Sequence, residues 1–193
     1  MAVGKRKSQQ VDMARIDYAT RKNLRESATP PHLRAMYGDR KKVEQDKTEY
    51  CTDDSEIYTE SIGPCIAICI AWRHWATMIH FSEMTESEED VAEMISNAKE
   101  AIPEDLVSTL RPFVCGGDTV DIFGVDDDPE VNEKRILLGR ERALAILHEA
   151  GFSEPHVRWN EPGETSALYA NLDGGVVSVA VGETDVESWP IVQ

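Results

Sequence analysis

One cysteine and one histidine, Cys65 and His80, lie fifteen positions apart within the longest apolar stretch of the chain. These residue types can perform nucleophilic catalysis, because an imidazole takes the thiol proton and later returns it to the leaving group. We expect Cys65 to be the nucleophile, its thiol pKa lowered from about 8.5 by a neighbouring imidazolium. We expect His80 to be its acid–base partner. Cys69 and Cys115 are interpreted as small buried hydrophobes, the usual role of a cysteine in an apolar strand.

Two apolar segments must position this pair. Residues 66–71 are rich in β-branched side chains and follow turn residues, which favours a buried strand. Residues 76–81 form a second apolar segment, and the short connection between the two predicts a β-hairpin. An even-numbered loop places Cys65 and His80 on one face, either directly opposite or diagonal to each other, whereas an odd-numbered loop places them on opposite faces. The sequence does not decide between these registers.

The order of these residues resembles the chemoreceptor glutamine deamidases of the CheD type. The signature of that family is Gly-Ser-Cys, an apolar strand, and then Asn-His-Phe. The corresponding residues here are Gly63-Pro64-Cys65 and Ile79-His80-Phe81. Pro64 stands in place of the serine and Ile79 in place of the asparagine. The resemblance implies a triad completed by Thr59, which orients His80.

The same resemblance extends over residues 58–181 and implies the fold shared with cytotoxic necrotizing factor-type toxin deamidase domains. Its expected helices are 86–101 and 130–150, its strand at 106–115 is interrupted by Pro112, and its closing strands are 157–159, 166–170 and 176–181. Together these elements predict an α+β fold, with a layered, sandwich-like β-sheet core and two flanking helices.

Attack on an amide creates an oxyanion, which needs N–H donors. Pro64 has no N–H, so we expect the backbone N–H of Cys65 to donate together with a second donor that the sequence does not assign. Gly116-Gly117 permits a positive φ or a close backbone approach. We therefore group four residues as expected substrate-binding or oxyanion residues: Gly63, Pro64, Gly116 and Gly117.

Charge divides the chain into two parts. Residues 1–49 carry a net charge of +5 and residues 50–193 carry −21, for a total of −16. We interpret 1–49 as a basic polar extension, disordered or partly helical, and 50–193 as the deamidase domain. A domain this acidic repels phosphates, which argues against nucleic acid as a partner.

The sequence also lacks the apolar run of a transmembrane helix or a Sec signal, so we expect no membrane insertion and a cytoplasmic location. An exported effector that lacks a Sec signal is the alternative. The cysteines fit no metal-binding pattern, and we expect neither a metal nor a cofactor. The acidic loop 118–128 lacks the spacing of an EF-hand and is interpreted as solvated.

The sequence therefore predicts a cysteine-dependent protein-glutamine deamidase, whose partner is a chemoreceptor or another glutamine-bearing protein. Two alternatives stay open. One is a catalytically silent protein of the same fold that docks a chemotaxis or signalling partner. The other is a toxin-like effector deamidase that acts on a host protein. The substrate protein and the oligomeric state are not predicted.

Overall fold

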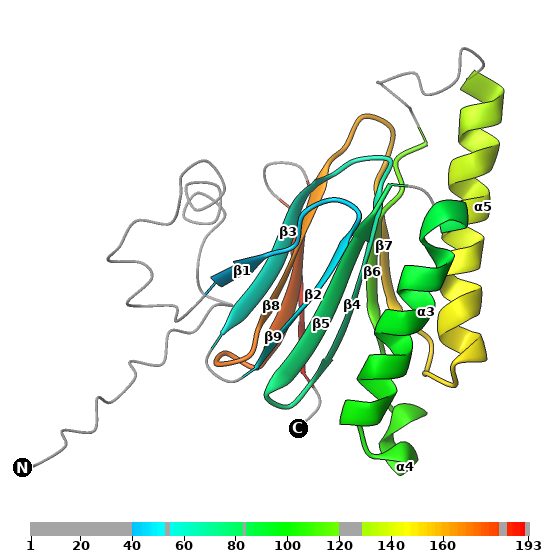
Figure 1. The fold of residues 1–193 in the computed structure, drawn as a ribbon. Helices are drawn as coiled ribbons and strands as arrows, with labels where there is room; N and C mark the ends of the chain where they lie inside the picture. The colour runs from blue at the N-terminus through cyan, green and yellow to red at the C-terminus, as the bar shows by residue number, and fades with distance from the viewer. Residues whose placement is uncertain (1–39, 53–54, 83, 120–128, 182–184, 192–193) are drawn as a thin grey trace, which may run out of the picture.

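The fold has three layers, formed by two β-sheets packed face to face and helices that cover the outer face of one sheet (Figure 1). The computed structural model describes residues 40–52, 55–82, 84–119, 129–181 and 185–191. The predicted α+β architecture, with a layered sheet core and two flanking helices, is confirmed.

In the described part of the chain, each sheet has five strands. The first sheet runs in the order β1 (Arg40–Lys42), β3 (Glu56–Ile62), β8 (Ser166–Asn171), β9 (Val176–Val181) and β10 (Asp185–Pro190). The second runs in the order β2 (Lys47–Thr52), β5 (Trp75–Phe81), β4 (Ile66–Trp72), β6 (Phe113–Gly116) and β7 (His156–Trp159). The β1–β3 and β6–β7 pairs are parallel, and the other pairs are antiparallel.

The helices lie against the second sheet. Within the described residues they are α3 (Met84–Ala101), the single turn α4 (Glu104–Val107) and α5 (Pro129–Glu149). Apolar residues of α3 and α5 pack on the isoleucines of β4, which forms one core, and a second core fills the space between the sheets. No helix in the described part of the chain is long and apolar enough to cross a membrane.

Strand β4 explains the continuous apolar run of the sequence. Ile66, Ile68 and Ile70 face the helices, whereas Cys65, Ala67 and Cys69 face the first sheet. A strand that is buried on both faces needs no polar alternation. Small side chains on one face and isoleucines on the other therefore set the spacing of the three layers.

The β4–β5 hairpin settles the register that the sequence left open. Trp72 pairs with Trp75 across the two-residue loop Arg73-His74, and Arg73 has a positive φ of 51°. His80 consequently pairs with Ala67. Because side chains alternate, His80 lies on the face that carries Cys65 and diagonal to it, which is one of the two even registers.

Other elements differ from the prediction. The strand expected over 106–115 starts only at Phe113, after Pro112, and residues 106 and 107 belong to α4. Residues 40–49, which composition grouped with the basic extension, contribute β1 and the start of β2 to the two sheets and are not helical. The rest of that segment, 1–39, lies outside the described residues.

Candidate active site

The three residues expected to form a triad lie at one end of the two sheets. Thr59 belongs to β3 of the first sheet, Cys65 precedes β4, and His80 belongs to β5 of the second sheet. The chain crosses from one sheet to the other over residues 62–66, directly at this end. A thiol, an imidazole and a hydroxyl from two sheets therefore face the same inter-sheet space.

Thr59 contacts His80 directly. The Thr59 Oγ1 lies 2.7 Å from His80 Nδ1 and donates to the carbonyl oxygen of Val43 at 2.8 Å. A hydroxyl has one hydrogen, so while that hydrogen is bonded to Val43 the oxygen can only accept a hydrogen bond from Nδ1–H. With Thr59 donating to Val43, this chain of hydrogen bonds favours the Nδ1–H tautomer of the neutral imidazole, which leaves a lone pair on Nε2.

The second ring nitrogen of His80 is buried and accepts no hydrogen bond from any described residue, the Cys65 thiol included. Buried polar atoms are nearly always satisfied, and exceptions require an explanation such as a catalytic role. A general base that is ready to take a proton would have such an unprotonated nitrogen without a hydrogen-bond partner. Catalytic hydrogen bonds often form only when the substrate is bound.

The electrostatics of the pair differ from the sequence-based expectation. Burial, with a further contribution from the Asp46 carboxylate, raises the pKa of the Cys65 thiol to about 11. Burial also lowers the pKa of His80, against the opposing effect of the Asp46 carboxylate. The expected lowering of the thiol pKa is therefore wrong for the free protein, because desolvation disfavours both charged forms. The pair rests as neutral thiol and neutral imidazole.

A distortion in β3 leads into the site. The register between β3 and β8 shifts between Thr59 and Ile62, and Ser61 has a positive φ of 59°. Bulges of this kind re-aim side chains and are frequent beside active sites. The bulge separates Thr59, which faces His80, from the turn that carries Cys65.

The expected oxyanion residues mainly hold the Cys65 turn in place. The Gly117 N–H donates to the Cys65 carbonyl at 2.7 Å, so it is already engaged. The Gly63 carbonyl accepts from the Asp118 N–H at 2.8 Å, and Pro64 is half-buried. Gly116, with a φ of 104°, lies so close to the Cys65 carbonyl that a Cβ there would overlap it.

Two residues that support this turn were not assigned from the sequence. Asn160 Nδ2 donates to the Ile62 carbonyl at 2.6 Å, and its backbone N–H donates to the Gly116 carbonyl at 2.9 Å. Arg140 donates to the carbonyls of Gly117 and Asn160 and lies over the Trp159 ring. The only sequence signal for Asn160 is a polar residue directly after a predicted strand.

The residues that link β1 to β2 complete the site. Val43 is fully buried and supplies the carbonyl that accepts from Thr59. The Asp46 N–H donates to the His80 carbonyl at 2.6 Å, and its carboxylate accepts from the Ser82 N–H and hydroxyl, each at 2.8 Å. Composition alone assigned both residues to the extension, because Lys and Arg dominate their surroundings.

Substitution of Gly116 tests how closely the turn is held. Gly116→Ala is expected to destabilise the protein by roughly 2–5 kcal/mol, since a positive φ costs about 1–2 kcal/mol and overpacking adds about 1–3 kcal/mol. Gly163→Ala is the matched control: its φ is also positive, at 82°, but nothing lies within 4 Å of the added Cβ. Urea unfolding measures both, and equal losses of stability would contradict the close approach.

All four cysteines are buried free thiols. In the described ranges no group of three or more His, Cys, Asp and Glu side chains is arranged to hold a metal ion. Most of the acidic loop 118–128 lies outside the described residues, but Asp118 is buried and accepts from the Gly163 N–H at 2.9 Å. In the described part of the loop, Asp118 thus supports the backbone.

Comparison with known proteins adds no family assignment. No family model matches the chain, and no curated protein matches its sequence.

Proposed function

We propose that this chain is a cysteine-dependent protein-glutamine deamidase, which converts glutamine side chains of a partner protein to glutamate. One observation carries the proposal. The hydrogen bonds from His80 through Thr59 to Val43 leave Nε2 as the unprotonated and unpartnered ring nitrogen, on the face of the sheet that also carries Cys65. The resemblance of the Thr59, Cys65 and His80 order to the CheD-type deamidases supports the same reaction.

The reaction begins from the neutral pair. Nε2 of His80 accepts the Cys65 proton as the sulfur forms a bond to the amide carbon, which gives a tetrahedral oxyanion. The imidazolium then protonates the amide nitrogen, the C–N bond breaks, and ammonia leaves a thioester. Water, deprotonated by the same nitrogen, hydrolyses the thioester to glutamate and restores the thiol. Thr59 keeps Nδ1 protonated throughout.

The first donor to the oxyanion in this proposal is the backbone N–H of Cys65, which also favours the thiolate form of that residue's side chain. Pro64 cannot contribute, and the Gly117 N–H is already bonded to the Cys65 carbonyl. Each donor of this kind is worth about 10²–10³ in rate. The second donor would come from the substrate-bound arrangement of the turn.

The direct test is conversion of glutamine to glutamate in a protein or peptide. The protein is incubated with glutamine-containing peptides; released ammonia is quantified, and mass spectrometry locates the residue that gains the mass of an amide-to-acid change. We expect both signals to rise together. Absence of conversion in every peptide, with the protein shown to be folded, would refute the proposed activity.

The pH dependence of that activity is set by His80. Burial lowers its pKa from the ordinary value of 6.5. The base form is populated above the pKa, so a lowered pKa moves the acid limb of kcat/KM below pH 6.5. Asp46→Asn is expected to move the limb lower still, because it removes a carboxylate that raises this pKa. Glu104→Gln, on α4, should leave it in place. An acid limb above pH 6.5 would contradict the geometry.

A silent binding protein of the same fold is the second candidate. The observation that favours it is the raised thiol pKa, about 11, together with the missing hydrogen bond between Cys65 and His80. Iodoacetamide distinguishes the two, because alkylation requires thiolate. An enzyme whose His80 assists deprotonation should be labelled at Cys65 before Cys51, Cys69 and Cys115, and more slowly in His80→Ala. Uniformly slow labelling favours binding alone.

The partner in the deamidase proposal is a chemoreceptor of the same cell or, for a delivered effector, a host protein. Both are glutamine-bearing proteins, and the chemistry of the site is the same for each.

A further inference from the structure

A groove of about 540 Å³ lies between strand β2 and helix α3. Its floor and walls include residues 46–50, Trp75 of β5, and Asp90, Glu93 and Met94 of α3. Ligand sites commonly enclose about 300–1,000 Å³, so the groove is large enough for several side chains of a bound segment. The mechanism proposed above uses none of the residues along its length except Asp46 at one end.

The groove follows a free sheet edge. In the described part of its sheet, β2 is the terminal strand and pairs only with β5. Successive side chains of a strand point to opposite faces, so five consecutive lining residues, 46–50, show that the groove borders the edge of β2 and not one face alone. The unpaired backbone groups of an edge strand are a template for another strand.

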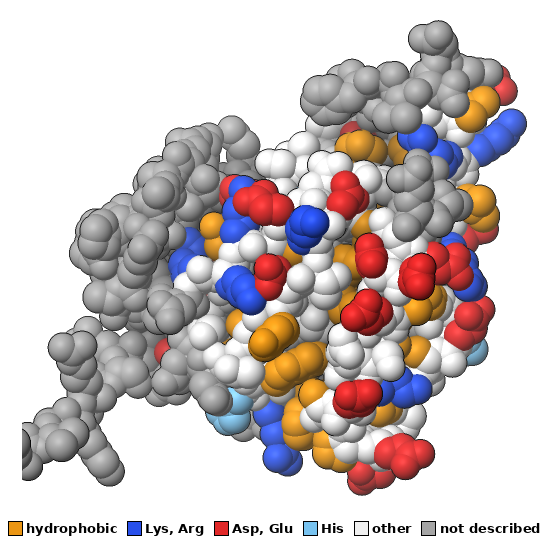
Figure 2. Space-filling view, viewed as in Figure 1, with side chains coloured by type: hydrophobic (Ala, Val, Ile, Leu, Met, Phe, Trp, Pro, Cys, Tyr) orange, Lys and Arg blue, Asp and Glu red, His pale blue; other side chains and the backbone are white. Residues whose placement is uncertain are grey.

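The walls of the groove are acidic. Four carboxylates, those of Asp46, Glu49, Asp90 and Glu93, line it against the single cation Lys47. Glu49 already pairs with Lys41 at 2.5 Å, whereas Asp90 and Glu93 are exposed on α3. Figure 2 shows this face of the molecule, with acidic side chains gathered beside an apolar patch. The field along the groove therefore favours a cationic ligand.

An apolar surface accompanies these charges. Tyr50 of β2 is 63% exposed, although it is a large hydrophobic residue, and Met94 and Trp75 contribute to the same groove. An exposed aromatic residue beside a free strand edge is typical of a surface that binds another chain.

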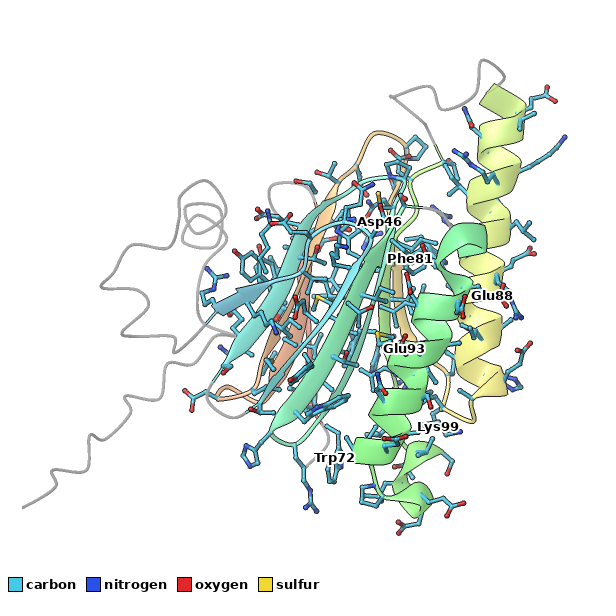
Figure 3. All side chains as sticks on the ribbon, viewed as in Figure 1. Asp46, Trp72, Phe81, Glu88, Glu93 and Lys99 are labelled. Carbon is cyan, nitrogen blue, oxygen red and sulfur yellow. The ribbon has the colours of Figure 1, made fainter. Side chains whose placement is uncertain are left out.

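One end of the groove adjoins the candidate active site. Asp46 lines the groove, and its N–H donates to the His80 carbonyl. The next residue, Lys47, pairs with His80 in the sheet. Figure 3 labels Asp46 at this end and Glu93 on the helix beside the groove. A segment bound along β2 would thus lead toward Cys65.

We propose that this groove binds an extended basic segment of the substrate protein, which adds to the free edge of β2 and sets its lysine or arginine side chains against Asp90 and Glu93. The inference rests on the proposed deamidase function, since the target glutamine would follow the segment beyond the Asp46 end. Main-chain hydrogen bonds to β2 would provide affinity, and the pairing of basic side chains of the segment with Asp90 and Glu93 would provide specificity.

Binding is measured separately from catalysis. The 193-residue Cys65→Ser chain is titrated against a fluorescent peptide of about ten residues, long enough to pair along β2. Lysines in the peptide alternate with threonine and valine around one glutamine. Anisotropy should show binding that weakens as salt is added, and no binding of the same peptide with glutamates in place of lysines.

Charge reversal locates the site. Asp90→Lys with Glu93→Lys is expected to weaken binding of the lysine peptide by about tenfold or more. Glu89→Lys with Glu100→Lys makes the same charge change on α3 outside the groove and should alter binding little. Two further peptides carry N-methyl groups, one on the odd-numbered amides and the other on the even-numbered amides. Only one of the two should lose binding, because only alternate amides face β2. Equal effects of the two charge reversals would overturn the inference.

The outcomes separate this inference from the deamidase proposal. A peptide that binds in the groove but keeps its glutamine in wild-type protein supports the groove and counts against the deamidase. If glutamine is converted at the same rate in wild type and in the Asp90→Lys, Glu93→Lys variant, the deamidase is supported and the groove is not. Residues 1–39 carry eight Lys and Arg against four Asp and Glu and are the competing occupant. A carbodiimide cross-link from 1–39 to Glu93 that the lysine peptide does not displace would overturn the inference.

Discussion

Replacing Cys65 with serine is expected to lower the rate of glutamine deamidation by about 10⁴-fold or more, the scale seen when a covalent nucleophile is lost. A serine hydroxyl is far less acidic than a thiol, so His80 would have to take a proton from a much weaker acid. The expected loss is in kcat, because the residues that would hold the peptide are unchanged. The measurement is ammonia release under saturating peptide.

Cys51→Ser is the matched control for this substitution. Cys51 is also a buried free thiol in the inter-sheet core, but it lies in β2 on the far side of β5 from Cys65. We expect Cys51→Ser to keep a rate close to that of wild type. Acid quenching during turnover should trap a peptide–thioester on Cys65 in the Cys51→Ser protein and none in Cys65→Ser. Comparable rates for the two variants would remove Cys65 from the reaction.

Local sequence pattern was sufficient for the layers of the fold. Strand β4 is apolar on both faces, and α5 ends before Gly151, whose φ is 90°. Such signals depend on near neighbours in the chain, which the sequence displays. The hairpin that carries Cys65 and His80 is likewise visible in the local pattern. Its register, however, changes when the loop is one residue longer or shorter. In the structure Trp72 pairs with Trp75, which leaves a two-residue turn.

The environment of the site depended on contacts between distant residues. The acceptor for Thr59 is the carbonyl of Val43, sixteen positions away, and Asn160 reaches Ile62 from ninety-eight positions away. A backbone carbonyl has no sequence signature, so neither contact could be predicted. The predicted direction of the Cys65 pKa shift was wrong for a related reason. That pKa depends on how completely the two sheets exclude water from the thiol, which is a property of the assembled layers.

From the sequence, the acidic charge of the domain argues only against nucleic acid as a partner. In the structure, part of that charge, at Asp90 and Glu93 of α3, faces the groove beside the edge strand β2, where it can select a partner. Net charge is visible in a composition, whereas its position relative to an edge strand requires the sheet order. The proposed substrate preference therefore depends on topology and not on the charge total.

Thr59→Val is expected to have a large effect on both activity and stability. Valine matches the shape of threonine but lacks the hydroxyl, so the Val43 carbonyl and His80 Nδ1–H both lose their buried partner. Each orphaned group costs about 1–3 kcal/mol. Without an acceptor at Nδ1, the imidazole proton can move to Nε2, which leaves no base for Cys65. Loss of the correct tautomer in a triad costs about 10⁴ in rate, and we expect a decrease of about 10²–10⁴-fold.

Thr59→Ser separates the role of the hydroxyl from that of packing. Serine keeps both hydrogen bonds and removes one methyl group, a loss of about 1 kcal/mol at a fully buried position. Its rate should return close to that of wild type. Nitrogen-15 NMR of the His80 ring should report the Nδ1–H tautomer in wild type and Thr59→Ser, and a shift toward Nε2–H in Thr59→Val. A Thr59→Val protein with an unchanged tautomer and a rate equal to that of Thr59→Ser would show that the hydroxyl contributes packing alone, and the hydrogen-bond chain on which the deamidase proposal depends would have no catalytic role.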